Sequence, residues 1–215
     1  MDLTKFSISK PTLRDIPAMR NLILPEVQRG IILDRTEDEM ASAIRSYSVV
    51  RLCNSSLDNH SADSKISPSL AEGDKGGGLN MQKISSTKFT NSDSTHPLRH
   101  PNAREGGQKA TNAPIIAFAA LQILSPTLAE IRSLIVGESY RRLGIATALI
   151  LHLIKEGESL NLKEILTLTY QKEVFAKIGF KEIAKDSLPN QKIWADCIKC
   201  KKFPICDEIA LLKTL

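Results

Sequence analysis

The sequence has no apolar run long enough to cross a bilayer. Its two most apolar stretches, IIAFAALQIL and IATALILHLI, have ten residues each, whereas a membrane-spanning helix needs about 20. The first residues, MDLTKFSISK, lack the apolar segment of a secretory signal. We therefore expect a cytoplasmic protein with no membrane partner.

A strong charge of either sign is also absent. The formal net charge is +5 at pH 7, from 29 Lys and Arg against 24 Asp and Glu. This mild and dispersed excess fits an anionic ligand, but it is too weak to indicate a nucleic-acid partner.

Cysteine is scarce, and three of the four cysteines lie close together near the C-terminus: Cys197, Cys200 and Cys206. In a reducing compartment this spacing favours metal ligands or packed thiols over disulfides. The Cys-x2-Cys pair suits tetrahedral zinc, with Asp207 or Cys53 as candidate fourth ligand. Packed, reduced thiols are the alternative.

Apolar periodicity is missing from residues 54–113. The segment is rich in Ser, Asn, Gly and Lys, and Phe89 is its single aromatic residue. Such a composition buries too little apolar surface to offset the entropy of ordering. We predict a disordered, low-complexity insertion at the tip of a β-hairpin. Its histidines are interpreted as solvated loop residues, with metal binding as the alternative: His60, His96 and His100.

Residues 1–53 and 114–215 together predict one mixed α/β domain with the order β-α-α-β-β-β-α-β-α-β. The predicted strands are 5–11, 46–53, 115–124, 129–136, 164–169 and 192–198. The predicted helices are 12–30, 36–47, 145–160 and 173–180.

Two of the predicted helices begin with the spacing of a capping box. Thr12 is followed three residues later by Asp15, and Thr36 by Glu39. In this arrangement each side chain binds a backbone amide that has no partner inside the helix.

The hexapeptide RRLGIA lies between a predicted strand ending at Val136 and a predicted helix starting near Ile145. The first amides of a helix have no intrahelical partner and lie at the positive end of its dipole. Gly144 allows a ligand to approach the backbone, and the flanking arginines add positive charge. The Walker and GxGxxG patterns are both absent. A plain helix start with solvated arginines is the alternative, but the strand and helix around the loop favour a pyrophosphate cradle.

The pattern R/Q-x-x-G-x-G/A after a strand is matched by Arg141, Gly144 and Ala146. It resembles the acetyl-CoA loop of the GNAT superfamily of N-acetyltransferases, and the likeness covers residues 1–53 and 114–215. The resemblance implies the GNAT fold, an α/β (α+β) architecture with a mixed, mostly antiparallel central sheet and helices on both faces. It also implies acetyl-CoA as cosubstrate.

In that superfamily the preceding strand splays open and pairs with the pantetheine arm of the coenzyme, which implicates Leu134 and Val136. The FAKIGF segment resembles the later helix and glycine-phenylalanine turn beside the coenzyme thiol. The loop amides hold the pyrophosphate, and this implicates Arg141, Arg142, Leu143, Gly144, Ile145 and Ala146.

The chain departs from the superfamily pattern at two positions. Phe175 stands where many members carry a tyrosine that protonates the departing thiolate, and Leu168 stands where an asparagine is often found. The leaving-group acid must then be another residue or solvent. Thr169 or Tyr170 are candidates to relay a proton, although Tyr170 is equally interpretable as a packing residue.

A narrower resemblance links three stretches to the short, stand-alone N-acetylglutamate synthases of bacterial arginine biosynthesis. These stretches are LILPEVQRGIILDRTEDEM, ILTLTYQKEVFAKIGF and LPNQKIWADCIKCKKFPICDEIAL. Phenylalanine at position 175 is usual in that group. The resemblance implies an amino-acid N-acetyltransferase that acetylates L-glutamate by direct transfer in a ternary complex. Alternatives are acetylation of another small amine or a protein N-terminus, and a non-catalytic acetyl-CoA-binding regulatory module. A homodimer is one open alternative for its assembly.

The chemistry requires a base, because an amino acid's ammonium must lose a proton before its nitrogen attacks a thioester. Glu130 starts the strand next to the loop and is the best-placed candidate; a solvated strand-end glutamate is the alternative. Strand amides near Leu134 to Val136 would stabilise the oxyanion.

A dicarboxylic acceptor requires cations that hold its carboxylates. Arg35 matches an arginine position of the short synthases. Arg132 alternates with Glu130 along the strand and so shares its face, and Lys192 precedes the last predicted strand. Each cation alone is interpretable as a surface charge; the prediction of an acceptor site rests on the set of three.

Overall fold

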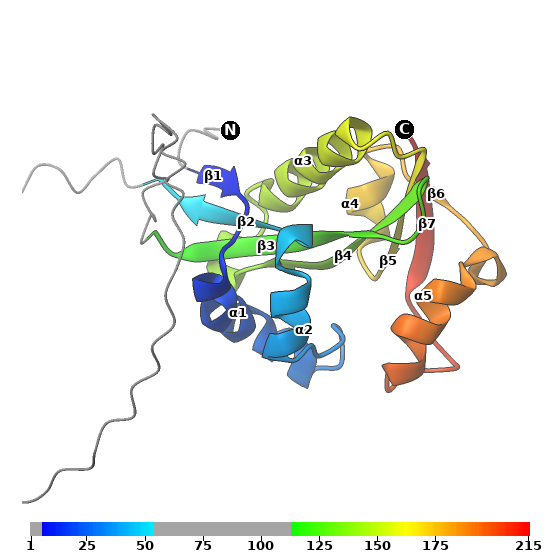
Figure 1. Cartoon of the computed structure of the whole chain (residues 1–215), viewed down its shortest axis with the longest axis horizontal. Helices are drawn as coiled ribbons and strands as arrows, with labels where there is room; N and C mark the ends of the chain where they lie inside the picture. Colours follow the sequence, from blue (N-terminus) through cyan, green and yellow to red (C-terminus); the bar gives the residue numbers. More distant parts are fainter. Residues whose placement is uncertain (1–5, 54–112) are drawn as a thin grey trace, which may run out of the picture. The chain divides into compact units, whose positions relative to one another are not determined.

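The computed structural model describes residues 6–53 and 113–215 (Figure 1). All of the predicted insertion except Ala113 lies outside the described residues. The strands are β1 (Phe6–Ser9), β2 (Tyr47–Leu52), β3 (Ile115–Ile123), β4 (Leu128–Val136), β5 (Glu164–Thr169), β6 (Lys181–Glu182) and β7 (Ile209–Thr214). The α-helices are α1 (Ile16–Gln28), α2 (Glu37–Ser42), α3 (Ile145–Ser159), α4 (Lys172–Ala176) and α5 (Asn190–Ala195).

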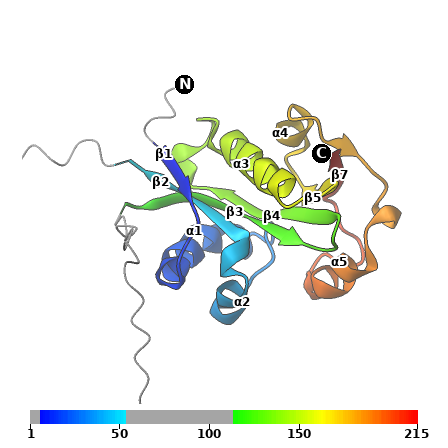
Figure 2. The ribbon, with the colours of Figure 1, turned by 45° about the horizontal axis from the view of Figure 1, so that its top comes forward.

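The strands form one sheet in the order β1-β2-β3-β4-β5-β7-β6. Neighbouring strands are antiparallel except β4 and β5, which run parallel. Helices α3 and α4 cover one face, whereas α1 and α2 lie on the other (Figure 1). Helix α5 lies on the side of α1 and α2, toward the β7 end of the sheet (Figure 2). The predicted mixed, mostly antiparallel sheet with helices on both faces is confirmed.

Strand β3 is buried on both faces, because its side chains alternate between two cores. Phe118 and Ala120 pack with the α1 and α2 residues, whereas Ala119 and Leu121 pack beneath α3. Within the described chain, no helix is long and apolar enough to cross a membrane.

Both predicted capping boxes are present. Thr36 accepts a hydrogen bond from the Glu39 amide at 3.1 Å, and the Glu39 carboxylate accepts one from the Thr36 amide at 3.0 Å. The Thr12 amide donates to the Asp15 carboxylate at 2.7 Å. At Thr12 the box opens a short 3-10 turn that leads into α1.

Strands β4 and β5 separate after three paired positions. Only Leu128–Glu130 pair with Glu164–Leu166, although both strands continue. Beyond that point β4 also carries a bulge, where Ser133 adopts a left-handed φ of 54°. The Thr167 hydroxyl donates to the Ile131 carbonyl at 2.9 Å, near where the strands diverge. The splayed strand that the family resemblance implied is therefore present.

The prediction of a strand at 192–198 is wrong, because these residues form the end of α5 and a 3-10 turn at Cys197–Lys199. A strand would place Lys192 and Trp194 on one face. In the helix Lys192 is 7% exposed and Trp194 is 72% exposed. The helical spacing brings Lys192 to Asp196, four residues on, at 2.9 Å. The last strand is instead β7, Ile209–Thr214.

Candidate functional site

A cleft of about 940 Å³ opens where β4 and β5 diverge. Its walls come from the end of α1 and the loop after it, from β4, from the start of α3, and from α5 with the segment after it. Of the predicted loop residues, Leu143 alone does not line the cleft. The predicted coenzyme, catalytic and acceptor residues that line it are Arg35, Glu130, Arg132, Leu134, Val136, Arg141, Arg142, Gly144, Ile145, Ala146, Thr169, Tyr170 and Lys192.

The predicted phosphate loop presents free backbone donors. Gly144 caps α3 in a left-handed conformation with φ of 73°, and Arg142 is left-handed at 62°. Within the described residues, the six amides from Arg142 to Thr147 donate to no protein acceptor. Consecutive unpaired amides at the positive end of a 15-residue helix suit a pyrophosphate. The residues present therefore fit that group.

Arg141 is held by protein groups. Its Nη2 donates to the buried Glu26 carboxylate of α1 at 2.8 Å, and its Nε donates to the Val136 carbonyl at 3.3 Å. This leaves the loop amides as the principal anion donors, with the Arg141 charge partly neutralised. Sequence reasoning missed Glu26, which is 115 residues away from its partner.

We expect Gly144→Val to weaken coenzyme A binding at least tenfold. A β-branched residue resists the left-handed φ of 73° at this position, so the loop must shift its amides. Calorimetric titration with coenzyme A measures the effect. Asn161→Val is the matched control, because Asn161 is also left-handed, with a φ of 59°, and does not line the cleft. Equal losses in both variants would contradict a binding role for the loop.

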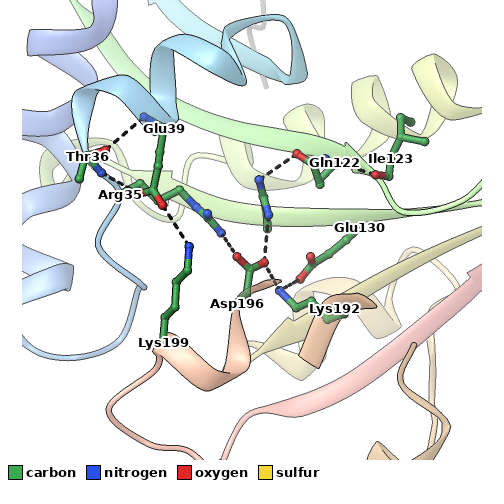
Figure 3. A network of polar contacts seen from close by, with 10 residues as sticks. Arg35, Thr36, Glu39, Gln122, Ile123, Glu130, Lys192, Asp196 and Lys199 are labelled. Carbon is green, nitrogen blue, oxygen red and sulfur yellow. Dashed lines mark hydrogen bonds and ion pairs between the residues drawn. The ribbon is translucent and has the colours of Figure 1, made fainter. Parts of the chain in front are cut away.

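The three predicted acceptor-binding cations converge on one carboxylate, that of Asp196 (Figure 3). Arg35 approaches its Oδ1 at 2.8 Å, while Arg132 and Lys192 approach its Oδ2 at 2.9 Å each. Arg132 also donates to Gln122 at 2.8 Å. The predicted set is therefore one cluster rather than three separate surface charges.

Glu130 belongs to the same cluster and is 2% exposed. Its Oε1 lies 2.6 Å from Lys192 Nζ, while its buried Oε2 has no partner within the described residues. Burial raises the pKa of Glu130, against the lowering effect of Lys192. A carboxylate with a raised pKa is a stronger base, and the free Oε2 is the atom that would accept a proton.

Sequence reasoning also missed Asp196 and Glu208, which line this cleft. Burial disfavours the charge of Asp196, yet Lys192 and Arg35 hold its pKa well below the usual range. Burial raises the pKa of Glu208, which lines the same cleft. The four-residue spacing from Lys192 to Asp196 was the available signal, and the strand interpretation of this segment concealed it.

The predicted proton-relay residues are engaged with the protein. The Thr169 hydroxyl accepts from the Gln171 amide at 2.9 Å. The Tyr170 hydroxyl donates to Asp207 at 2.8 Å and accepts from Lys202 at 2.7 Å. Their part in proton transfer remains a prediction.

The three C-terminal cysteines are free thiols that line the cleft. The part of the chain that the structure describes holds no group of three His, Cys, Asp or Glu residues arranged for a metal. Asp207, a candidate fourth ligand, instead binds Lys202 at 2.9 Å. The predicted zinc site at Cys197, Cys200 and Cys206 therefore has no support.

Comparison with protein families shows that residues 79–180 match the acetyltransferase (GNAT) family. An uncharacterized N-acetyltransferase of Chlorobaculum tepidum is 42% identical over 103 residues. That match covers 47% of this chain and 64% of the relative, so this chain spans less than two thirds of the relative's length.

Two solved structures share the fold. The first is an N-acetylglutamate synthase from Neisseria gonorrhoeae, complexed with coenzyme A and N-acetyl-glutamate. Its TM-score is 0.61 at 18% identity, covering 98% of this chain and 35% of that one. The second, a protein from Mycobacterium tuberculosis in complex with coenzyme A, has a TM-score of 0.57 at 16% identity, covering 97% and 99%.

Proposed function

Because the chain is a member of the GNAT superfamily of N-acetyltransferases, we propose that it transfers an acetyl group from acetyl-CoA to an amino acid. The acceptor group is the α-amine of L-glutamate, and the transfer is direct, within a ternary complex. This activity is that of an N-acetylglutamate synthase of arginine biosynthesis.

One observation carries the proposal: a buried base and three cations line the same cleft as the loop of free amides. Glu130 Oε2 is unpaired, and the cluster around Asp196 contains three cations against two carboxylates. The remaining positive charge suits an acidic acceptor. The cation cluster and the amide loop thus offer separate sites for an acceptor and a coenzyme in one cleft.

Each part of the cleft then has a role. The amides of residues 142–147 hold the coenzyme pyrophosphate, and the unpaired edge of β4 from Leu134 to Val136 holds its pantetheine arm. Acetyl-CoA supplies the thioester that the amine attacks. Glu130 takes the proton from the acceptor ammonium, and β4 amides stabilise the negative charge that develops on the carbonyl oxygen.

The acceptor carboxylates bind Arg35, Arg132 and Lys192. The Nε atoms of both arginines are buried and have no acceptor within the described residues, and an unsatisfied buried donor costs about 1–3 kcal/mol. A carboxylate of the acceptor would satisfy them. The solved synthase that shares this fold was complexed with N-acetyl-glutamate, which is the product of the proposed reaction.

The test is thiol release from acetyl-CoA with a panel of amino acids and a peptide with a free N-terminus. We expect L-glutamate to give the highest kcat/KM, and glutamine, which lacks the second carboxylate, to give a value lower by at least tenfold. No glutamate-dependent release would refute the proposed acceptor. The absence of thiol release with every acceptor in the panel, together with tight coenzyme A binding, would indicate a regulatory module instead.

A further inference from the structure

Asp196 connects three parts of the chain that are distant in sequence. Arg35 lies in the loop before α2 and Lys192 lies on α5 (Figure 3). Arg132 lies on β4. Their contacts with Asp196 are 2.8–2.9 Å long, and Asp196 is 5% exposed. Charge-assisted hydrogen bonds of this length, shielded from water, restrict the side chains that make them.

Asp196 accepts a hydrogen bond from only one nitrogen of each guanidinium. It contacts Arg35 through Nη2 and Arg132 through Nη1, so neither arginine binds it as a two-nitrogen fork. The Nε atoms of both arginines are buried and lack acceptors in the described chain. The arginines thus keep donors for a second carboxylate while Asp196 stays in place.

Asp196 also sets the charge of the cluster. Among the groups joined by ion pairs, the three cations Arg35, Arg132 and Lys192 face two carboxylates, Asp196 and Glu130, which leaves one positive charge without an ion-pair partner. An amino acid with one excess carboxylate neutralises it. An acceptor with a further negative charge would face the Asp196 carboxylate, and like charges in a buried site repel strongly.

We infer that Asp196 is a positioning residue that fixes the two arginines and restricts the acceptor to amines with one net negative charge. This inference rests on the proposed function, because it concerns the acceptor of that reaction. It assigns acceptor selection to a carboxylate within the cation cluster, in addition to the cations themselves.

Calorimetric binding in the presence of coenzyme A tests this inference. The two probes are L-glutamate, with one net negative charge, and O-phospho-L-serine, with nearly two. The wild type should prefer L-glutamate. In Asp196→Asn the ratio of the two affinities should move toward O-phospho-L-serine by about tenfold or more, because one repelling charge is gone.

Two further variants separate charge from folding. Asp196→Glu keeps the charge and should keep the wild-type ratio, even if both affinities fall. Asp186→Asn removes an equivalent charge from an exposed side chain that does not line the cleft, and should leave the ratio within twofold, because water screens it. Thermal melts followed by circular dichroism establish that each variant is folded.

An unchanged ratio of the two affinities in Asp196→Asn, whether or not both affinities fall, overturns the inference. A wild type that binds neither probe also overturns it. Failure of the proposed function gives a different result. A wild type that binds L-glutamate yet releases no thiol contradicts the acetyl-transfer reaction, while the affinity ratio still measures the role of Asp196.

Discussion

Replacing Glu130 by glutamine is expected to lower kcat for acetyl transfer by about 10²–10⁴-fold, the usual contribution of a general base. Glutamine has the same shape but cannot accept the proton of the acceptor ammonium. Within the described residues Glu130 pairs with Lys192, and the proposed coenzyme site is formed by other residues, those of the loop 142–147. Coenzyme A affinity should therefore stay within about twofold.

Thiol release at saturating acetyl-CoA and L-glutamate measures kcat, and calorimetry measures coenzyme A affinity. Glu164→Gln is the matched control, because Glu164 lies on β5, the parallel neighbour of β4, and does not line the cleft. It should retain wild-type kcat. If Glu130→Gln also retained kcat, the base would lie elsewhere, and Glu208 would be the next candidate because it lines the same cleft.

Replacing Lys192 by methionine is expected to lower the free energy of unfolding by about 3–5 kcal/mol at pH 8, the usual cost of removing one member of a buried ion pair. Lys192 lies 2.6 Å from Glu130 and 2.9 Å from Asp196. Asp196 keeps its two arginines in the variant, whereas Glu130, 2% exposed, loses its only partner within the described residues.

Urea unfolding at pH 8 and pH 5.5 measures this effect and its sign. Burial raises the pKa of Glu130, and the pKa must rise further once Lys192 is absent. Such a group destabilises the fold at high pH, and the penalty fades as the pH falls through its folded pKa. The stability difference between wild type and variant should therefore narrow at pH 5.5.

Lys199→Met provides the control for Lys192→Met. Lys199 follows α5, has a side chain 58% exposed, and pairs with Glu39 at 3.3 Å. An exposed ion pair contributes little, so this variant should stay within about 1 kcal/mol of wild type. Equal destabilisation by both variants would show that the buried pair with Glu130 has no special weight.

The sequence by itself determined the features that depend on near neighbours. The Thr36–Glu39 capping box spans three residues, and the Gly144 loop lies between β4 and α3. Such signals are local, because a helix start is specified by the residues that satisfy its first amides. The strand and helix patterns that predicted a mixed sheet, and the loop motif that carried the family resemblance, are local signals of the same kind.

Only the tertiary structure decided how the site is assembled. Arg35 and Asp196 are 161 residues apart, so no local pattern relates them. The alternation in KIWADCI indicated a strand, but Lys192 lies in helix α5. There it is buried and pairs with both Glu130 and Asp196. An ion pair between distant elements is specified by their packing, and the pairing of Asp196 with the predicted cations is therefore visible only in the fold.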